Sequence, residues 1–269
     1  MSNIRTTVRA IAMLALSAIS VAAMNAAASA ATVQDIVKRG NVTIGVLVGS
    51  PPIGFQDENG NLAGYDVDVA NYLGKLLGVT VNLVPVTSPN RVAELVAGKV
   101  DFMVATLNPL PDRAMSVAFT IPYEGFKAVM VEKATDNYKT YDDLKGKKIG
   151  LTRGSNNEGI LGKYVDKVGF QMVRFDDDST VLQALATGQI DAAAEPDATI
   201  YPLLKSRPDM GLKVAFDMAL SANSIAVRLD DTNLLQWLNT AINFMKQSGD
   251  LNAISQKWIG VDVPPLPTF

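Results

Sequence analysis

The sequence lacks cysteine and histidine altogether, and each absence excludes a kind of chemistry. Without cysteine, the folded chain depends on its apolar core rather than on disulfides. Without histidine, it has no Ser-His-Asp or Cys-His catalytic arrangement and no histidine-ligated metal site. Nothing else in the sequence indicates a metal or a cofactor, and we expect neither.

Long apolar runs are also missing after the first thirty residues. Before that point, Arg5 and Arg9 precede the apolar segment 10–23, and Ala28-Ser29-Ala30 has the small-x-small pattern of a signal-peptidase site. The apolar segment is short for a membrane span. We therefore expect residues 1–30 to be a signal peptide and the protein to be periplasmic, with a retained membrane anchor as the alternative.

A basic excess is missing as well. Once the two basic residues of the predicted signal peptide are removed, 22 Lys and Arg remain against 27 Asp and Glu, a net charge near −5. Such a balance gives no electrostatic reason to expect a nucleic acid or an anionic membrane as a partner. We expect a monomer without nucleic acid.

What the sequence does contain is an alternation of strand and helix patterns, typical of an α/β fold. Strands are predicted at 42–48, 79–86 and 100–105, and an Asn-Gly turn predicts a hairpin over 55–62. Asp66 is a candidate N-cap for a helix that ends near Leu77, and Ser88 for a helix that buries Val92, Leu95 and Val96.

A second unit of the same kind follows residue 123. Its predicted strands are 148–151, 171–175 and 190–194, with one helix from Ser155 to about 168 and another capped by Asp178 or Ser179. We take the neighbouring acids Asp176 and Asp177 as part of that cap, because the three acids lack the spacing of a calcium loop. A long amphipathic helix is predicted at 233–248, held down by Trp237, Phe244 and Trp258.

Two short strands, 127–131 and 224–227, are placed to pass between the two units. The pattern therefore predicts two lobes joined by a two-segment hinge. The first lobe comprises residues 31–126 plus 224–269, and the second comprises 127–223. Each lobe is expected to contain a mostly parallel sheet flanked by helices.

Polar side chains follow three of the predicted strands, where open α/β sheets bind ligands. They are Ser88 and Arg91, then Thr106, Asn108 and Arg113, then Gly154, Ser155 and Asn156. Free N–H groups at a helix start attract an anion, and an Arg of the opposite lobe can clamp the same anion. Taken singly, these residues also fit surface charges, turn formers and helix caps. Their shared position at strand ends favours a carboxylate site between the lobes.

Several ordered segments resemble one protein family along nearly the whole chain after residue 30. They are PPIGFQDENGNLAGYDVDVANYLGKLLG, NRVAELVAGKVDFMVATLNPLPDRAMSVAFTIPY, DDLKGKKIGLTRGSN and LQALATGQIDAAAEPDA. They resemble the periplasmic solute-binding proteins of polar amino-acid ABC transporters, family 3. The resemblance implies a two-lobed periplasmic-binding-protein fold of type II, which closes on a small-molecule amino acid and presents it to a membrane permease.

The resemblance also implies roles for single residues. Arg113 matches the Arg that pairs with the ligand α-carboxylate, and Thr106 and Asn108 match residues at the α-amino and carboxylate ends. Ser155 and Asn156 match helix-start donors of the second lobe. Ser88 and Arg91 resemble the arrangement in members that bind acidic or amide amino acids, where the Arg addresses the ligand side chain.

Three departures from the family pattern concern the ligand. Ser50 stands where many members have an aromatic residue that stacks on the ligand, and Leu47 stands where binders of cationic ligands often have an acid. The Asp that usually holds the ligand ammonium aligns with Pro196, so Glu195 or Asp197 is expected to take that role. Arg91 together with Leu47 favours glutamate, aspartate or glutamine as the ligand, rather than lysine or arginine.

Two other functions are compatible with the same scaffold. Some relatives of the family are cyclohexadienyl dehydratases, and Glu195 or Asp197 could be the general acid of such an enzyme. A sensor or adhesin lobe is a third interpretation, which the lack of a fused kinase segment or a second apolar span disfavours. We expect a receptor rather than an enzyme.

Overall fold

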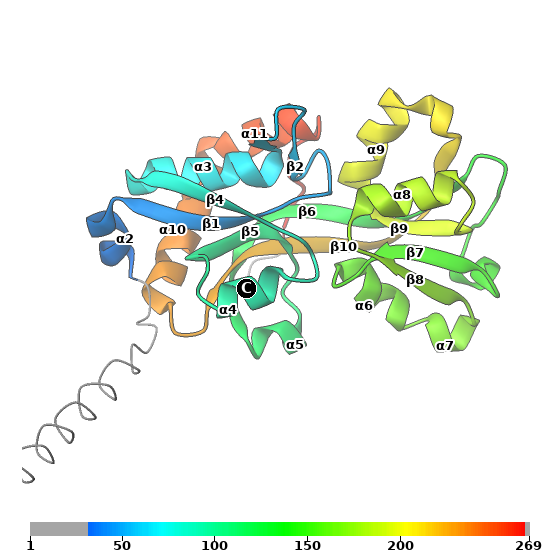
Figure 1. Cartoon of the computed structure of the whole chain (residues 1–269), viewed down its shortest axis with the longest axis horizontal. Coiled ribbons are helices and arrows are strands. Elements are labelled where there is room, and N and C mark those ends of the chain that lie inside the picture. The colour runs from blue at the N-terminus through cyan, green and yellow to red at the C-terminus, as the bar shows by residue number, and fades with distance from the viewer. Residues whose placement is uncertain (1–31, 267–269) are drawn as a thin grey trace, which may run out of the picture. The chain divides into compact units, whose positions relative to one another are not determined.

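The computed structural model describes residues 32–266, so the predicted signal peptide lies outside the described residues. Eight strands form one mixed sheet in the order β4-β1-β5-β10-β6-β9-β7-β8 (Figure 1). They are β1 (Asn41–Leu47), β4 (Thr80–Val86), β5 (Phe102–Leu107), β6 (Val117–Lys133), β7 (Lys148–Thr152), β8 (Gln171–Phe175), β9 (Ala192–Pro196) and β10 (Leu212–Arg228). The predicted hairpin is confirmed as β2 (Phe55–Gln56) and β3 (Leu62–Ala63).

Helices flank this sheet and follow most of its strands. They are α2 (Val33–Arg39), α3 (Tyr65–Leu77), α4 (Arg91–Val96), α5 (Pro111–Ala114), α6 (Asn156–Gly162), α7 (Val165–Val168), α8 (Asp178–Ala186), α9 (Asp197–Ser206), α10 (Thr232–Ser248) and α11 (Asp250–Trp258). Short 3-10 turns occupy 141–144 and 208–210. No helix within the described residues is long and apolar enough to cross a membrane.

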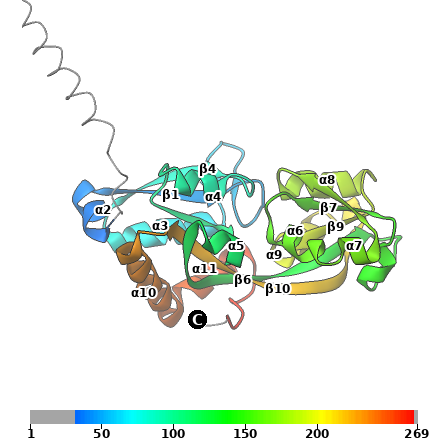
Figure 2. The same ribbon diagram turned by 90° about the horizontal axis from the view of Figure 1, so that it is seen from below.

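The sheet has a parallel group of strands at each end and two long antiparallel strands between them. β1 pairs in parallel with β4 and β5, and β7 pairs in parallel with β8 and β9. β6 and β10, of 17 residues each, pair antiparallel and connect the two groups (Figure 2). The two strands predicted to pass between the lobes are segments of β6 and β10.

Apolar side chains cover both faces of the sheet in each group. Ile44 of β1 packs with Leu73 of α3 and Leu238 of α10 on one face, and Met103 of β5 packs with Leu95 of α4 on the other. In the second group the alternation of Ala192, Ala193 and Ala194 in β9 divides the strand between two further clusters. Burying one such leucine contributes roughly 2 kcal/mol.

Three predicted helix caps are wrong. The N-cap of α3 is Gly64, and that of α4 is Asn90. The N-cap of α8 is Asp177, whose side chain accepts from the N–H of Thr180. Each helix therefore begins at a residue other than the one predicted. Asp66, Ser88 and Asp178 are not needed as caps, and their side chains are free for other contacts.

The predicted burial is wrong on two helices. In α4, Val96 is 52% exposed, whereas Arg91 is only 2% exposed. On α10, Phe244 is 50% exposed, although Trp237 and Trp258 pack against the core as predicted. α4 has only six residues: its first, Arg91, is buried against backbone carbonyls, whereas Leu95 packs in the apolar cluster and Val96 is left outside it.

Candidate ligand-binding site

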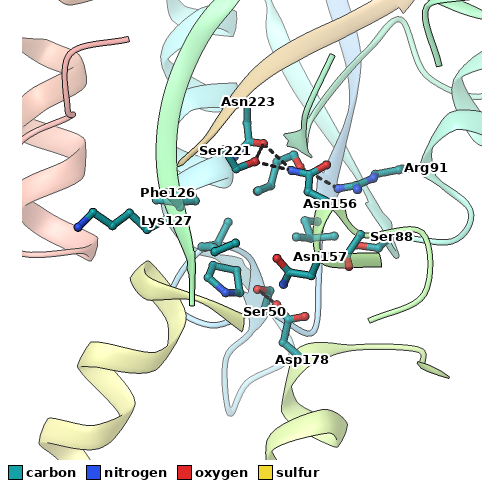
Figure 3. Close-up of a pocket in the computed structure, with 16 residues that line it drawn as sticks. Ser50, Ser88, Arg91, Phe126, Lys127, Asn156, Asn157, Asp178, Ser221 and Asn223 are labelled. Carbon is teal, nitrogen blue, oxygen red and sulfur yellow. Dashed lines mark hydrogen bonds between the residues drawn. The ribbon is translucent and has the colours of Figure 1, made fainter. Parts of the chain in front are cut away.

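A cavity, partly open to solvent, lies where polar side chains of the two strand groups meet (Figure 3). Six of the residues predicted from the sequence line it: Ser50, Ser88, Arg91, Thr106, Ser155 and Asn156. In Figure 3, Asn156, Ser221 and Asn223 gather on one side of the space, and Ser50 and Asp178 on the other. Lys127 is directed away from it, and its Nζ pairs with Asp217 at 2.7 Å.

Besides Lys127, four polar residues of the cavity were not predicted. They are Asn157, Asp178, Ser221 and Asn223. Asn157 follows the predicted pair directly and belonged to the same helix start. Asp178 was interpreted as a cap. Ser221 and Asn223 alternate along β10, which places them on one face of the strand, but no motif marks them.

The side chain of Arg91 is buried and held by backbone carbonyl groups. Nη1 donates to the carbonyl oxygens of Ala105 and Thr106 at 2.5 and 3.1 Å, and Nη2 donates to that of Gly154 at 3.2 Å. Nε has no partner within the described residues. Burial, and then the neighbouring Arg113, lower the pKa of Arg91 to about 9. The group therefore stays charged at neutral pH without a hydrogen bond to any carboxylate.

Arg113 does not line the cavity but lies directly behind Asn156. It donates to Asn156 Oδ1 at 2.8 Å, to the Gly154 carbonyl at 2.8 Å and to the Asn108 carbonyl at 3.0 Å. Burial lowers its pKa. Its partners are thus neutral oxygens, as they are for Arg91.

Two of the N–H groups expected to form an anion site at the start of α6 already have acceptors. The Gly154 amide donates to Glu158 Oε2 at 2.8 Å, and the Ser155 amide donates to the Thr152 carbonyl at 3.1 Å. The Ser155 hydroxyl caps the helix by accepting from the Glu158 amide. Arg91 and Arg113 instead donate to the carbonyl oxygen of Gly154.

Thr106 has a backbone conformation that is rare for a β-branched residue, with φ at 49°. Two contacts hold it. Its amide donates to Tyr123 Oη at 3.1 Å, and its hydroxyl donates to Asp66 Oδ2 at 3.0 Å. Asn108, two residues on, donates to Ser221 Oγ at 3.2 Å and to the Ala222 carbonyl at 3.1 Å, so it joins β10 without lining the cavity.

Behind Thr106 lies a buried acidic group. Asp66 accepts from the Tyr123 hydroxyl at 2.6 Å as well as from Thr106. Burial raises the pKa of Asp66 to about 7, although both hydroxyl contacts act in the other direction. Burial, and then Asp66, raise the pKa of Glu124 well above its usual value.

Asp178 is the one acidic side chain among the lining residues described. Its two oxygens accept from the hydroxyls of Ser50 and Thr152, and no Lys or Arg of residues 32–266 lies within ion-pair distance of it. Ser50 also lies 3.4 Å from the Thr199 hydroxyl. Burial raises the pKa of Asp178, and the two hydroxyl bonds oppose this shift.

Glu195 and Asp197, the two acids predicted near the ligand ammonium, do not line this cavity. Glu195 is fully buried in β9 without a hydrogen-bond partner in the described part of the chain, and burial raises its pKa well above the usual value. Asp197 begins α9, accepts from the Lys127 amide at 3.0 Å and lines a separate cavity.

Two α/β units connected by long antiparallel strands, with a polar cavity where they meet, define the class of two-lobed solute-binding proteins. This chain belongs to the bacterial extracellular solute-binding proteins, family 3, whose family model matches residues 42–261. The predicted family and α/β fold class are therefore confirmed.

Named relatives cover most of the chain. The L-cystine-binding protein TcyJ of Escherichia coli K12 is 32% identical over 230 residues, which are 85% of this chain and 86% of that protein. ABC transporter arginine-binding protein 1 of the same strain is 29% identical over 221 residues, 81% of this chain and 90% of that protein. The solved structure of an ancestral arginine-binding protein bound to arginine has 35% sequence identity and a TM-score of 0.77, and the match covers 82% and 99% of the two chains.

Proposed function

We propose that this protein is a periplasmic receptor that captures a polar amino acid by hinge closure and delivers it, as a monomer, to an ABC permease. The lobes would be residues 31–126 plus 224–269 and residues 127–223. Support comes from contacts that cross this boundary, among them Ser50 with Asp178 and Arg113 with the Gly154 carbonyl. A ligand that contacts both lobes shifts the population toward the closed state.

The charges around the cavity carry the proposal about ligand class. The buried guanidinium of Arg91 and the partly buried guanidinium of Arg113 make no hydrogen bond to a carboxylate of the described residues. One buried carboxyl group, that of Asp178, has only hydroxyl partners. An acidic amino acid carries two carboxylates and one ammonium, which is the complement of this set. Glutamate and aspartate therefore fit best, followed by glutamine, whose side-chain amide can accept from Arg91.

We infer a separate role for the basic and for the acidic group of the cavity. The Nε–H of Arg91 has no acceptor among the described residues, and its Nη2 donates to the Gly154 carbonyl. A ligand carboxylate could accept from Nε with one oxygen and replace the Gly154 carbonyl as the acceptor of Nη2 with the other. Asp178, rather than Glu195 or Asp197, would hold the ligand ammonium, since it lines the cavity. The hydroxyls of Ser88 and Thr106 and the amides of Asn156 and Asn157 would complete the polar contacts.

An enzyme on this scaffold finds less support than a receptor. Glu195 and Asp197, the acids considered for a dehydratase, do not line the cavity, and the family description names solute-binding proteins. Turnover of prephenate or arogenate by the purified protein would overturn the receptor proposal.

The test is a titration calorimetry and thermal-shift panel on protein that has been unfolded and refolded to remove carried-over ligand. The panel contains L-glutamate, L-aspartate, L-glutamine, L-arginine, L-histidine and L-cystine. A ligand that binds only the native state raises stability by RT ln(1 + [L]/Kd). We expect an acidic amino acid to give the largest shift. Binding of arginine or cystine with no response to glutamate or aspartate would contradict the ligand class and leave the receptor function standing.

A further inference from the structure

A second cavity, partly open to solvent, lies on the other side of β6 from the candidate site. We call it the rear cavity. Its apolar lining includes Phe126 of β6, Tyr201 of α9, Leu220 of β10 and Ile259 after α11. Tyr201 and Leu220 are more than half exposed, as is Val261, which also lines it. Large apolar residues exposed together around one hollow mark a binding surface.

The charge of the rear cavity is negative. Asp197 and Asp262 line it, and within the described residues neither makes an ion pair. Asp197 accepts from the Lys127 amide, and Asp262 accepts from the Gln256 side chain at 2.8 Å. The one cation among the described lining residues, Lys127, pairs with Asp217 at 2.7 Å and also interacts electrostatically with Asp197. An apolar hollow with two carboxylates and no free cation suits an organic cation with an apolar body.

The rear cavity shares a wall with the candidate ligand site. Phe126 and Lys127 line both cavities. The rear lining also takes residues from both predicted lobes, with Asp197 and Tyr201 from the second and Ile259 and Asp262 from the first. Closure of the lobes therefore changes the space available on both sides of the same strand.

We propose that the rear cavity is a second binding site, for a small monocation with an aromatic or aliphatic body, and that its occupancy changes the affinity of the candidate ligand site. The cation would lie against Asp197 and Asp262, and the apolar body against Phe126, Tyr201 and Leu220. The first part is independent of the proposed function, because it concerns different side chains. The coupling rests on the proposed function.

The test of the site uses phenethylammonium as the probe and neutral 2-phenylethanol as its matched control, both followed by ligand-observed NMR. Phenethylammonium should bind saturably, and we expect 2-phenylethanol and the Asp197→Asn, Asp262→Asn double variant to bind about tenfold more weakly or worse. Tyr201→Ala should weaken binding, whereas Phe244→Ala, at an aromatic residue of similar exposure on α10, should not. No saturable binding below about 10 mM would overturn the site.

A further variant shows which of the two cavities holds the probe, because an ammonium group can also bind at Asp178. Asp178→Asn should leave the binding of phenethylammonium unchanged. Loss in that variant, with retention in the double variant, would place the probe in the candidate ligand site and overturn the proposal. With the bound amino acid at saturation, the affinity for phenethylammonium should change severalfold, since coupling between two sites is reciprocal. An unchanged affinity overturns the coupling. If no amino acid binds at all, the proposed function fails while the probe measurements still decide on the rear cavity.

Discussion

Arg91 and Arg113 donate to the same acceptor, the carbonyl oxygen of Gly154, at 3.2 and 2.8 Å. A buried and a partly buried guanidinium group therefore converge on one neutral oxygen. Each arginine lies in the predicted first lobe, and Gly154 lies in the second. The carbonyl thus occupies the position that suits an anion, and a ligand carboxylate would compete with it for the same donors.

Replacing Arg91 tests whether the ligand uses this position. Arg91→Lys keeps a charge but loses the fork that reaches the Ala105, Thr106 and Gly154 carbonyls. We expect calorimetry to show the affinity for an acidic amino acid falling about 100-fold or more, as is usual when a buried charged hydrogen bond is lost. Arg153→Lys is the control, since Arg153 belongs to the same loop as Gly154 but has a side chain 55% exposed beside Asp176. Equal affinities for the two variants would contradict the role of Arg91.

Replacing Gly154 tests closure of the lobes without replacing an arginine. A Cβ on Gly154 would lie 3.0 Å from the Ser88 carbonyl oxygen and 3.3 Å from Pro89 Cα, and φ is 69°. Gly154→Ala should therefore hold the lobes apart, and we expect about tenfold weaker binding and a larger radius of gyration in X-ray scattering.

Gly146→Ala is the matched control for Gly154→Ala. Gly146 has a φ of 73°, but nothing lies within 4 Å of an added Cβ. Both substitutions carry a backbone cost of about 1 kcal/mol. Only Gly154→Ala should change affinity and shape. Equal losses in the two variants would show that backbone strain, and not lobe contact, is responsible.

Asp178 and Asp177 allow the same substitution at neighbouring positions with different expected results. Asp178→Asn removes the carboxylate of the cavity, so the affinity for an amino acid should fall about 100-fold. Because burial raises the pKa of Asp178, its ionised form is less favourable in the folded than in the unfolded chain. The variant should therefore be at least as stable as the wild type in urea unfolding at pH 8. Asp177→Asn should change neither property, since Asn caps a helix as well as Asp. Retained affinity in Asp178→Asn would leave the ammonium site unassigned.

The sequence was informative about strands and strand ends and less so about which polar groups turn inward. Alternation and turn residues predicted α10 and the β2–β3 hairpin, because these patterns are local. Whether Asp178 or Asp177 caps α8 depends on one residue of register, and that register decides which carboxylate reaches the cavity. Arg91 could not be predicted as buried, since its partners are carbonyls of β5 and of Gly154, far away in the sequence. Ser221 and Asn223 form hydrogen bonds with Asn108 and Asn156, which belong to distant segments of the sequence. The sequence of β10 therefore gave no sign of their place in the cavity.

The pH dependence of stability should show whether the buried Asp66 has a raised pKa. Its pKa is about 7 in the folded chain against 3.8 for an unperturbed Asp, so the folded state binds the proton more tightly. The stability from this group is fully present below pH 3.8 and is lost as the pH rises through 7.

Asp66→Asn removes this titration while keeping an acceptor for Thr106 or Tyr123. We expect the free energy of unfolding, measured with urea, to fall between pH 5 and pH 8 by about 2 to 3 kcal/mol more in the wild type than in the variant. Glu124 and Asp178 act in the same direction in both proteins, so they cancel in the comparison to the extent that they titrate independently of Asp66. Parallel pH profiles for the two proteins would show that Asp66 titrates near its ordinary value. The hydroxyl contacts that position Thr106 would then involve an ionised carboxylate throughout.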